Sequence, residues 1–164
     1  MTRRIDDPVW QEVEEGEELA PLAFPLSVYR LVMAAGANRD FNSIHHNSDY
    51  ARVSGAPEIY ANNFLLQGMW ERLVRDRIGL GSVIRRLSGF RMRIFNTVGD
   101  TVTVRGRVRR KWLEGGEGVL EGFVEFEIWS ENAGGVSVGP GTMVATMPLA
   151  AGAAHRRDGL AGEG

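Results

Sequence analysis

Apolar residues recur at helical spacing in a stretch that runs from residue 57 to about residue 78. Charged residues occupy the opposite side of the same stretch, so we expect one long amphipathic helix. Asn62 and Asn63 fall on the apolar side near its N-terminal end, where buried amides would need hydrogen-bond partners. The apolar stripe itself consists of Ile59, Leu66, Met69, Trp70, Leu73 and Val74.

A shorter helix is predicted earlier in the chain. Ser27 is a typical N-cap residue and Gly36 a typical stop signal, so the helix is expected to run through about Ala35. Leu31 and Val32 would then face inward.

After Gly81 the apolar period changes to two, which is typical of strands with one exposed face. We expect strands near residues 90–94, 102–109, 120–128 and 136–148. Gly139, Pro140 and Gly141 interrupt the last of these and predict a bulge or kink.

The glycine-rich residues 114–118 predict a hairpin between the second and third of these strands. Opposite charges on the exposed faces suggest its register, because cross-strand pairs of opposite charge are favourable. The expected register places Arg105, Arg107 and Lys111 opposite Glu127, Glu125 and Glu121, respectively.

The predicted order is a charged arm, a helix, a polar loop, a long helix and four antiparallel strands. This order favours an α+β fold: a single domain, residues 1–149, with the long helix lying on a curved antiparallel sheet. Residues 1–18 form the arm, which Trp10 would anchor to the body. Residues 150–164, rich in Ala and Gly, are expected to be a disordered tail.

Composition narrows the possible functions. The 164 residues carry a net charge of −2, which provides no field for gathering nucleic acid. Cysteine is absent, which excludes disulfides, thiolate zinc sites and a thiol nucleophile. No apolar run approaches the roughly 20 residues of a membrane span, and the first residues are not signal-like. We therefore expect a cytoplasmic enzyme or binding protein without a membrane or nucleic-acid partner.

Residues 39–46 bring a carboxylate, an amide and two imidazoles together. Asp40 and His45 form an acid/base couple that can move protons near neutral pH. The alternative is a local role, because Asp and Asn also favour turns and helix caps. A zinc site is not expected, since His45 and His46 are adjacent and lack a suitably spaced third ligand. His46 is expected to be structural or solvent-facing.

Residues 40–45, which read D-F-N-S-I-H, resemble the signature D-x-N-P-(aliphatic)-H of the MaoC-like, or R-specific, enoyl-CoA hydratases of the hot-dog fold. Ala51 matches a small position of that family, and residues 98–102 resemble its G-D turn into a strand. The resemblance covers roughly residues 10–149. It is particularly close to actinobacterial relatives that hydrate steroid side-chain enoyl-CoAs.

The resemblance implies hydration of trans-2-enoyl-CoA to 3-hydroxyacyl-CoA, or the reverse dehydration, without a cofactor. Asp40 would be the base and His45 would orient the water and share the returned proton. Asn42 is implied to fix the loop and to belong to the substrate site. Asn62 and Asn63 stand where many relatives have a His-Gly pair whose glycine N–H faces the thioester carbonyl, and Ser43 replaces the signature proline.

Two other functions stay open at this point. A hot-dog acyl-CoA thioesterase would place its carboxylate in the long helix, and Glu58 is the only carboxylate near the expected start of that helix. A subunit that needs a partner chain is the other alternative. The family resemblance implies a homodimer or a heteromer with another hot-dog subunit, with the acyl-CoA as ligand.

Overall fold

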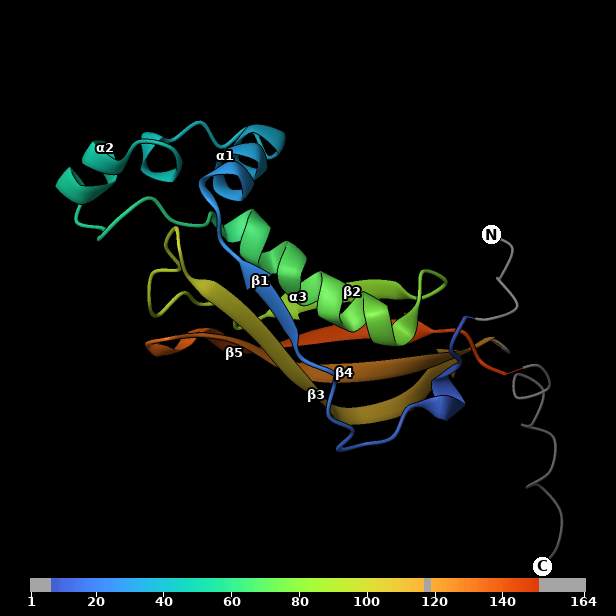
Figure 1. Cartoon of the computed structure of the whole chain (residues 1–164). Helices are drawn as coiled ribbons and strands as arrows, with labels where there is room; N and C mark the ends of the chain where they lie inside the picture. Colours follow the sequence, from blue (N-terminus) through green and yellow to red (C-terminus); the bar gives the residue numbers. More distant parts are fainter. Residues whose placement is uncertain (1–6, 117–118, 151–164) are drawn as a thin grey trace, which may run out of the picture.

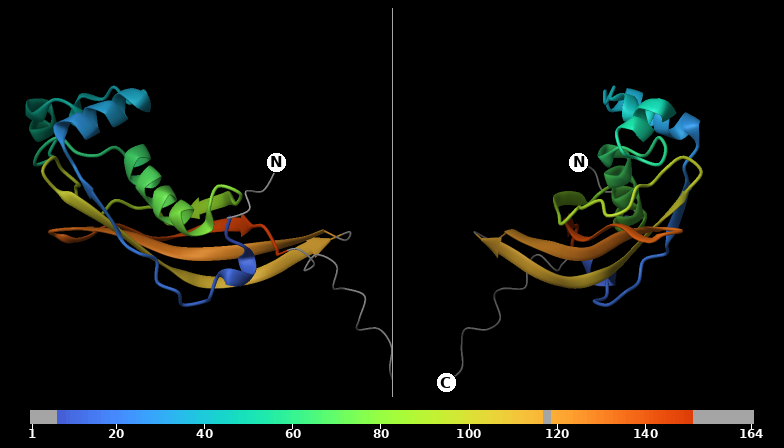
Figure 2. Two further views of the ribbon diagram at one scale, coloured as in Figure 1. Left: turned by 45° about the vertical axis from the view of Figure 1, so that its right-hand side comes forward. Right: turned by 90° about the vertical axis from the view of Figure 1, so that its left-hand side faces the viewer.

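A five-stranded antiparallel sheet curves around one long helix (Figures 1 and 2). The structure is a computed structural model and describes residues 7–116 and 119–150. The sheet order is β1-β3-β4-β5-β2, so the two short strands form its edges. The expected α+β class, with a long central helix on a curved antiparallel sheet, is confirmed. The strands are β1 (Leu22–Pro25), β2 (Val83–Ser88), β3 (Thr101–Gly116), β4 (Val119–Asn132) and β5 (Gly135–Met147).

The central helix α3 (Asn63–Ile78) packs its apolar side against the inner face of the sheet. Burial of each large side chain on this side contributes about 1.5–3 kcal/mol, so this layer supplies much of the stability. The Trp70 indole N–H also donates to the Ser130 hydroxyl at 2.8 Å, which satisfies its polar atom inside the core. The buried residues of α3 are Leu66, Met69, Trp70, Leu73, Val74 and Ile78.

The long helix starts six residues later than its apolar pattern predicts. It begins at Asn63 because the side chain of Asn62 accepts a hydrogen bond from the Leu65 N–H, which makes Asn62 the N-cap. Ile59 is buried as expected, but it lies in the preceding loop rather than on the helix. Asn63 is exposed, so its predicted place on the inner face is wrong.

Helix α1 (Val28–Ala37) begins as predicted but ends later. Ser27 is the N-cap and accepts a hydrogen bond from the Arg30 N–H at 3.1 Å. Gly36 does not stop the helix, which continues to Ala37. Leu31 is buried, whereas Val32 is 41% exposed, contrary to expectation. The inward position one turn further along is taken by Ala35.

The β3–β4 hairpin exists, but the predicted register is wrong. Arg107 lies opposite Glu127 rather than Glu125, and Glu114 lies opposite Glu121 in the place expected for Lys111. The observed register differs from the predicted one by two residues up to Val108. A bulge between Val108 and Arg110 increases the difference to three residues in the rest of the hairpin. Opposite charges still pair across the hairpin in the observed register. Arg107 forms an ion pair with Glu127, and both Arg109 and Arg110 form ion pairs with Glu125.

The edge strands differ from the prediction. β1 is not expected from the sequence, because four residues containing a proline carry almost no periodic signal. Of the strand expected near residues 90–94, only an isolated antiparallel bridge between Met92 and Val138 forms, and the regular strand in this part of the chain is β2, at residues 83–88. A short helix, α2 (Ser48–Val53), also separates residues 39–46 from α3.

The expected irregularity in β5 is confirmed. The register against β4 shifts between Ile128 and Ser130, where Gly139 and Pro140 form the bulge, and again between Ser130 and Glu131. Gly139 has a φ of 81°, and a Cβ there would lie 2.9 Å from the Trp70 ring. A glycine is therefore required where the strand bends over the central tryptophan.

Trp10, in the short helix η1 (Trp10–Glu12), ties the N-terminal segment to the sheet. Its indole N–H donates to the Phe123 carbonyl at 3.0 Å, and the Lys111 ammonium lies 4.2 Å from the ring centroid. Residues 1–6 of the expected arm and 151–164 of the expected tail lie outside the described residues. In the described segments, none of the helices is both long and apolar enough for a membrane crossing.

Candidate functional site

The site lies where α1, the short helix η2 (Ser43–His45) and α2 gather at the N-terminal end of α3 (Figure 1). These elements form a layer that stands off from the sheet, as both views of Figure 2 show. Asp40 and His45 belong to this layer, and the loop that leads into α3 lies beneath it. Asp40 and His45 are therefore placed where the layer formed by α1, η2 and α2 meets the start of α3.

The end of α1 fixes the position of Asp40. The Asp40 N–H donates to the Ala35 carbonyl at 2.9 Å, and the Arg39 N–H donates to the Gly36 carbonyl at 3.1 Å. These two bonds form a Schellman cap, in which the residue after the C-cap adopts the left-handed conformation. That residue is Arg39, with a φ of 55°, the only non-glycine residue with positive φ in the described part of the chain. The carboxylate is thus carried by the residue that closes the helix cap.

His45 is held from two sides. Asn42 caps η2 by accepting the Ile44 N–H at 3.2 Å, which fixes the turn that carries the imidazole. Nδ1 of His45 lies 2.8 Å from the Tyr60 carbonyl oxygen, and the ring packs edge-on against the Tyr60 ring. Because a carbonyl can only accept, Nδ1 carries a proton and Nε2 faces the other way.

The two candidate catalytic side chains meet at 3.1 Å, between Nε2 of His45 and Oδ2 of Asp40. This distance is within hydrogen-bonding range for the two side chains. The His45 side chain is 6% exposed, whereas the Asp40 side chain is 29% exposed. The pair is therefore anchored at the histidine and open at the carboxylate, where a small reactant can reach it.

The pKa of the Tyr60 phenol is shifted by its surroundings next to Asp40 and His45. Burial, and secondarily the negative charge of Asp40, raise the pKa of the Tyr60 phenol above its ordinary value of 10.0. The phenol is therefore neutral near pH 7 and does not compete with the pair as a base.

The start of α3 presents hydrogen-bond donors to the same region. The Leu65 N–H is taken by the cap, whereas the N–H groups of Asn63 and Phe64 have no partner within the helix. The Asn62 side chain is buried, and its Nδ2 has no hydrogen-bond partner among the described residues. Its Oδ1 is 3.5 Å from Nδ2 of Asn38, two residues before Asp40. These donors suit an oxygen that carries or develops negative charge.

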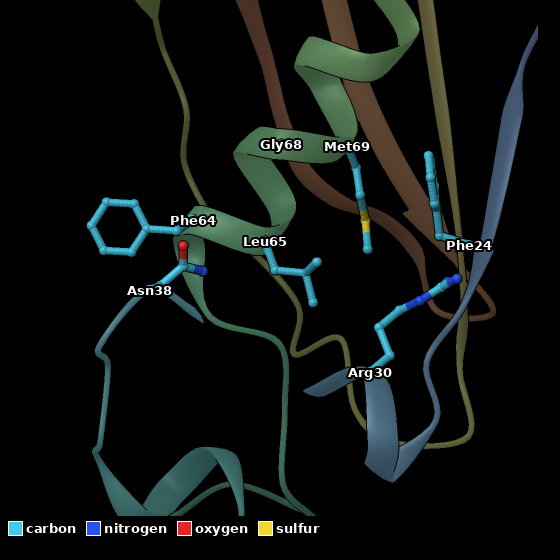
Figure 3. A pocket seen from close by; sticks show the side chains of 7 residues that line it. All are labelled: Phe24, Arg30, Asn38, Phe64, Leu65, Gly68 and Met69. Carbon is cyan, nitrogen blue, oxygen red and sulfur yellow. The ribbon is translucent and has the colours of Figure 1, made fainter. Parts of the chain in front are cut away.

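A cleft of about 380 Å³ runs between α1, β1 and the first turns of α3 (Figure 3). Its walls are mostly apolar, with an amide and a guanidinium as the polar groups. A cleft of this size is within the range of small-molecule sites. The lining residues are Phe24, Arg30, Asn38, Phe64, Leu65, Gly68 and Met69.

Other candidates from the sequence are placed away from this chemistry. Glu58 precedes α3 and forms an ion pair with Arg52 at 2.6 Å. The pKa of Glu58 is lowered mainly by a hydrogen bond from Ser48 and secondarily by one from the Ile59 N–H. The carboxylate therefore stays ionised and paired with Arg52. His46 is exposed and 3.5 Å from the Phe41 carbonyl. Within residues 7–116 and 119–150, no three His, Asp or Glu side chains are grouped as metal ligands.

Several contributors to this region are not evident from the sequence. The Tyr60 carbonyl is a backbone group, so the residue type gives no indication that it hydrogen-bonds to the His45 imidazole. Arg39 gives no signal, because glycine is the residue expected in the left-handed position. Gly68 carries no signal beyond its place inside a helix. Asn38 could have been noticed, since Asn commonly ends helices.

No protein-family model matches the chain. A curated relative, the 3-oxo-4,17-pregnadiene-20-carboxyl-CoA hydratase beta subunit of Mycobacterium tuberculosis, is 35% identical over 78 residues. This match covers 48% of the present chain and 60% of that relative, so it spans less than two thirds of the relative's length.

Two solved structures extend the similarity. A chain of the ChsH1–ChsH2 complex of Mycobacterium tuberculosis has a TM-score of 0.70 and 27% identity, and the match covers 82% of the present chain and 98% of that chain. The (R)-hydratase of A. caviae involved in PHA biosynthesis has a TM-score of 0.71 and 22% identity, and the match covers 84% and 99%, respectively. The last comparison shows the shared fold.

Proposed function

We propose that this chain, which is a MaoC-like hot-dog protein, adds water to the double bond of trans-2-enoyl-CoA thioesters or removes it in the reverse direction. The observation that carries the proposal is the convergence of Asp40 and His45 at 3.1 Å, with the carboxylate accessible. A named hydratase among the relatives supports the reaction class.

The reaction needs one proton taken from water and one delivered to C2. The Asp40 carboxylate removes the proton from a water molecule whose oxygen attacks C3, and the proton held at Nε2 of His45 passes to C2. The proton gained by Asp40 then restores the pair, so no net proton is consumed. Dehydration follows the same steps in reverse.

The third requirement is stabilisation of the charge that develops on the thioester oxygen. The N–H groups of Asn63 and Phe64 at the start of α3 are the proposed donors, together with Nδ2 of Asn62. In this assignment Asn63 acts through its backbone, and its exposed side chain borders the entrance. Asn42 holds the loop through its cap, and its part in the substrate site stays a prediction.

The test is incubation of the purified chain with a panel of enoyl-CoAs of increasing size, followed by mass spectrometry. We expect a product heavier than the substrate by one water, with the thioester intact. Release of free coenzyme A without hydration would instead identify a thioesterase and overturn the proposal.

A heteromeric assembly is the second candidate, and it is favoured by exposed apolar residues next to the site. Tyr29 and Met33 on α1 are 75% and 54% exposed, and Phe64 at the cleft is 60% exposed. One of the similar structures is a complex of two chains. If the isolated chain hydrates no enoyl-CoA but does so when a second hot-dog chain is added, the chain is the catalytic subunit of a heteromer.

A further inference from the structure

Tyr60 lies beside His45 in the loop that leads into α3, and backbone pairing fixes its position. It pairs with Thr97 in an isolated antiparallel bridge. The next residue extends this pairing, because the Ala61 N–H donates to the Asn96 carbonyl at 2.9 Å. Backbone that is paired in this way is less mobile than a free loop, so the side chain of Tyr60 projects from a defined place.

The ring of Tyr60 is held between two other rings. It packs edge-on against the His45 imidazole, with the centroids 5.3 Å apart, and is tilted against the Phe95 ring at 4.8 Å. The Tyr60 carbonyl oxygen also lies 2.8 Å from Nδ1 of the same imidazole. His45 is therefore contacted by both the backbone and the side chain of one residue.

The hydroxyl group of Tyr60 is not used by the fold. Within the described part of the chain, the contacts that hold Tyr60 involve its backbone and its ring, and its hydroxyl forms no hydrogen bond. The residue is partly buried, and a buried tyrosine hydroxyl usually has a hydrogen-bond partner. Phenylalanine would make the same ring contacts, so packing does not explain why position 60 carries a hydroxyl.

The hydroxyl lies within electrostatic reach of Asp40. Nε2 of His45 is 3.1 Å from Oδ2 of Asp40, so the carboxylate stands at the end of the imidazole that faces away from the Tyr60 carbonyl. After burial, the negative charge of Asp40 is the second cause that raises the pKa of the Tyr60 phenol. The phenol stays protonated near pH 7 and offers an O–H donor close to the accessible carboxylate.

We propose that the Tyr60 hydroxyl is a further group of the active site and donates a hydrogen bond to the oxygen that is added at C3. The proposal rests on the proposed function, because it assigns a contact within the same site. Asp40 accepts one proton of the water, one lone pair of the water oxygen attacks C3, and the other lone pair accepts from Tyr60. In the dehydration direction the same O–H stabilises the negative charge that develops on the leaving oxygen. The phenol keeps its proton throughout, so the proton balance of the reaction is unchanged.

The first test measures binding without turnover. It compares two CoA thioesters that both carry two methyl groups on C2, one with a hydroxyl group at C3 and one without. Neither can lose water, because C2 carries no proton. Calorimetry should show that the wild-type chain binds the hydroxyl-bearing thioester more tightly. Equal affinity for the two thioesters would overturn the proposal.

Tyr60→Phe removes the hydroxyl but keeps the ring and the carbonyl. It should reduce the preference for the hydroxyl-bearing thioester by about 3–10-fold, which corresponds to one hydrogen bond, and leave the affinity for the other thioester unchanged. Tyr50→Phe is the matched control, because it removes the same atom from a side chain that is 51% exposed on α2, and it should keep the wild-type preference. An unchanged preference in Tyr60→Phe, or equal losses for both thioesters, would contradict the assigned contact.

Hydration kinetics separate a hydrogen-bond donor from a residue that only packs. Tyr60→Phe should lower kcat by about tenfold while KM for the enoyl-CoA and the melting temperature stay nearly constant, because the water rather than the thioester loses a contact. A lower melting temperature with an unchanged kcat would make Tyr60 a packing residue and overturn the proposal.

The two sets of measurements also separate this proposal from the proposed function. If Tyr60→Phe loses the preference for the hydroxyl-bearing thioester while the wild-type chain hydrates no enoyl-CoA, the proposed function fails and the Tyr60 contact stands. If the wild-type chain hydrates enoyl-CoAs and Tyr60→Phe matches it in both kcat and ligand preference, the Tyr60 contact fails and the proposed function stands.

Discussion

At the scale of single residues, the site depends on backbone conformation as much as on side-chain chemistry. Asp40 is placed by the Schellman cap of α1, and that cap requires Arg39 to adopt a left-handed conformation. His45 is oriented by a carbonyl group of Tyr60. The motif residues can be recognised in the sequence. The groups that position their side chains are mostly backbone atoms, which the sequence does not reveal.

Substitution of Arg39 should separate backbone from side-chain effects. Arg39→Gly should stabilise the protein by up to about 1 kcal/mol and retain hydration, because glycine adopts positive φ without strain. Arg39→Val should lower both stability and kcat, since a β-branched residue resists this conformation and would displace Asp40. Chemical denaturation and hydration kinetics measure the two effects. Equal activity in the Gly and Val variants would show that the cap does not position the carboxylate.

Asn62 offers a test of the proposed oxygen donors. Asn62→Ser keeps an N-cap of similar quality but removes Nδ2, so the melting temperature should change little. We expect kcat to fall about tenfold or more, because one donor to the developing negative charge is lost. Asn62→Ala, which loses both the cap and the donor, should be destabilised by about 1 kcal/mol in addition. A fully active Ser variant would assign Asn62 to the helix cap alone.

At the scale of elements, the strongly periodic segments were predictable and the short ones were not. The body of α3 and the long strands β3, β4 and β5 follow directly from their apolar periods. β1 and α2 are too short to show a period. β1 forms by pairing with β3, which is distant in the sequence, whereas α2 begins at a local cap, the side chain of Asn47, which accepts the Tyr50 N–H. The β3–β4 register could not be obtained from charge pairing alone, because a bulge after Val108 and the position of the turn both alter it.

The contact between the N-terminal segment and the last turn of α3 is also an element-scale feature. Arg77 donates to both carboxylate oxygens of Glu17, at 2.5 and 3.0 Å, and to the Glu12 carbonyl at 2.6 Å. The hydrogen bonds that Glu17 accepts, led by those from Arg77, lower its pKa below the ordinary value of 4.5. A carboxylate with a lowered pKa in the folded state stabilises the protein above its ordinary pKa, and this contribution is lost as the pH falls.

Glu17→Gln should therefore reduce the free energy of unfolding near pH 7 by on the order of 1 kcal/mol, since both partners are partly exposed to solvent. The difference from the wild type should shrink as the pH falls below 4.5. Urea titrations across this range measure it. Glu71→Gln, which removes an exposed pair with Arg75 on the same helix, serves as the control and should have a smaller effect. A difference for Glu17→Gln that grows toward acid pH would contradict the assignment.

At the scale of the whole molecule, a curved sheet and its central helix provide a rigid body, and the layer formed by α1, η2 and α2 carries the candidate chemistry (Figure 2). The cleft lies between α1, β1 and the first turns of α3, and its lining includes neither Asp40 nor His45. The fold and the identity of the Asp/His pair could be anticipated from residues 40–45. The cleft could not, because it arises from packing between α1, β1 and α3.

The central claim is that Asp40 and His45 together activate water for addition to an enoyl thioester. Its most direct test is the hydration rate of Asp40→Asn and His45→Ala, measured on an enoyl-CoA that the wild type converts, with melting temperatures recorded alongside. We expect kcat/KM to fall by about 10²–10⁴-fold in each variant while the protein remains folded. Hydration at the wild-type rate by either folded variant would contradict the account.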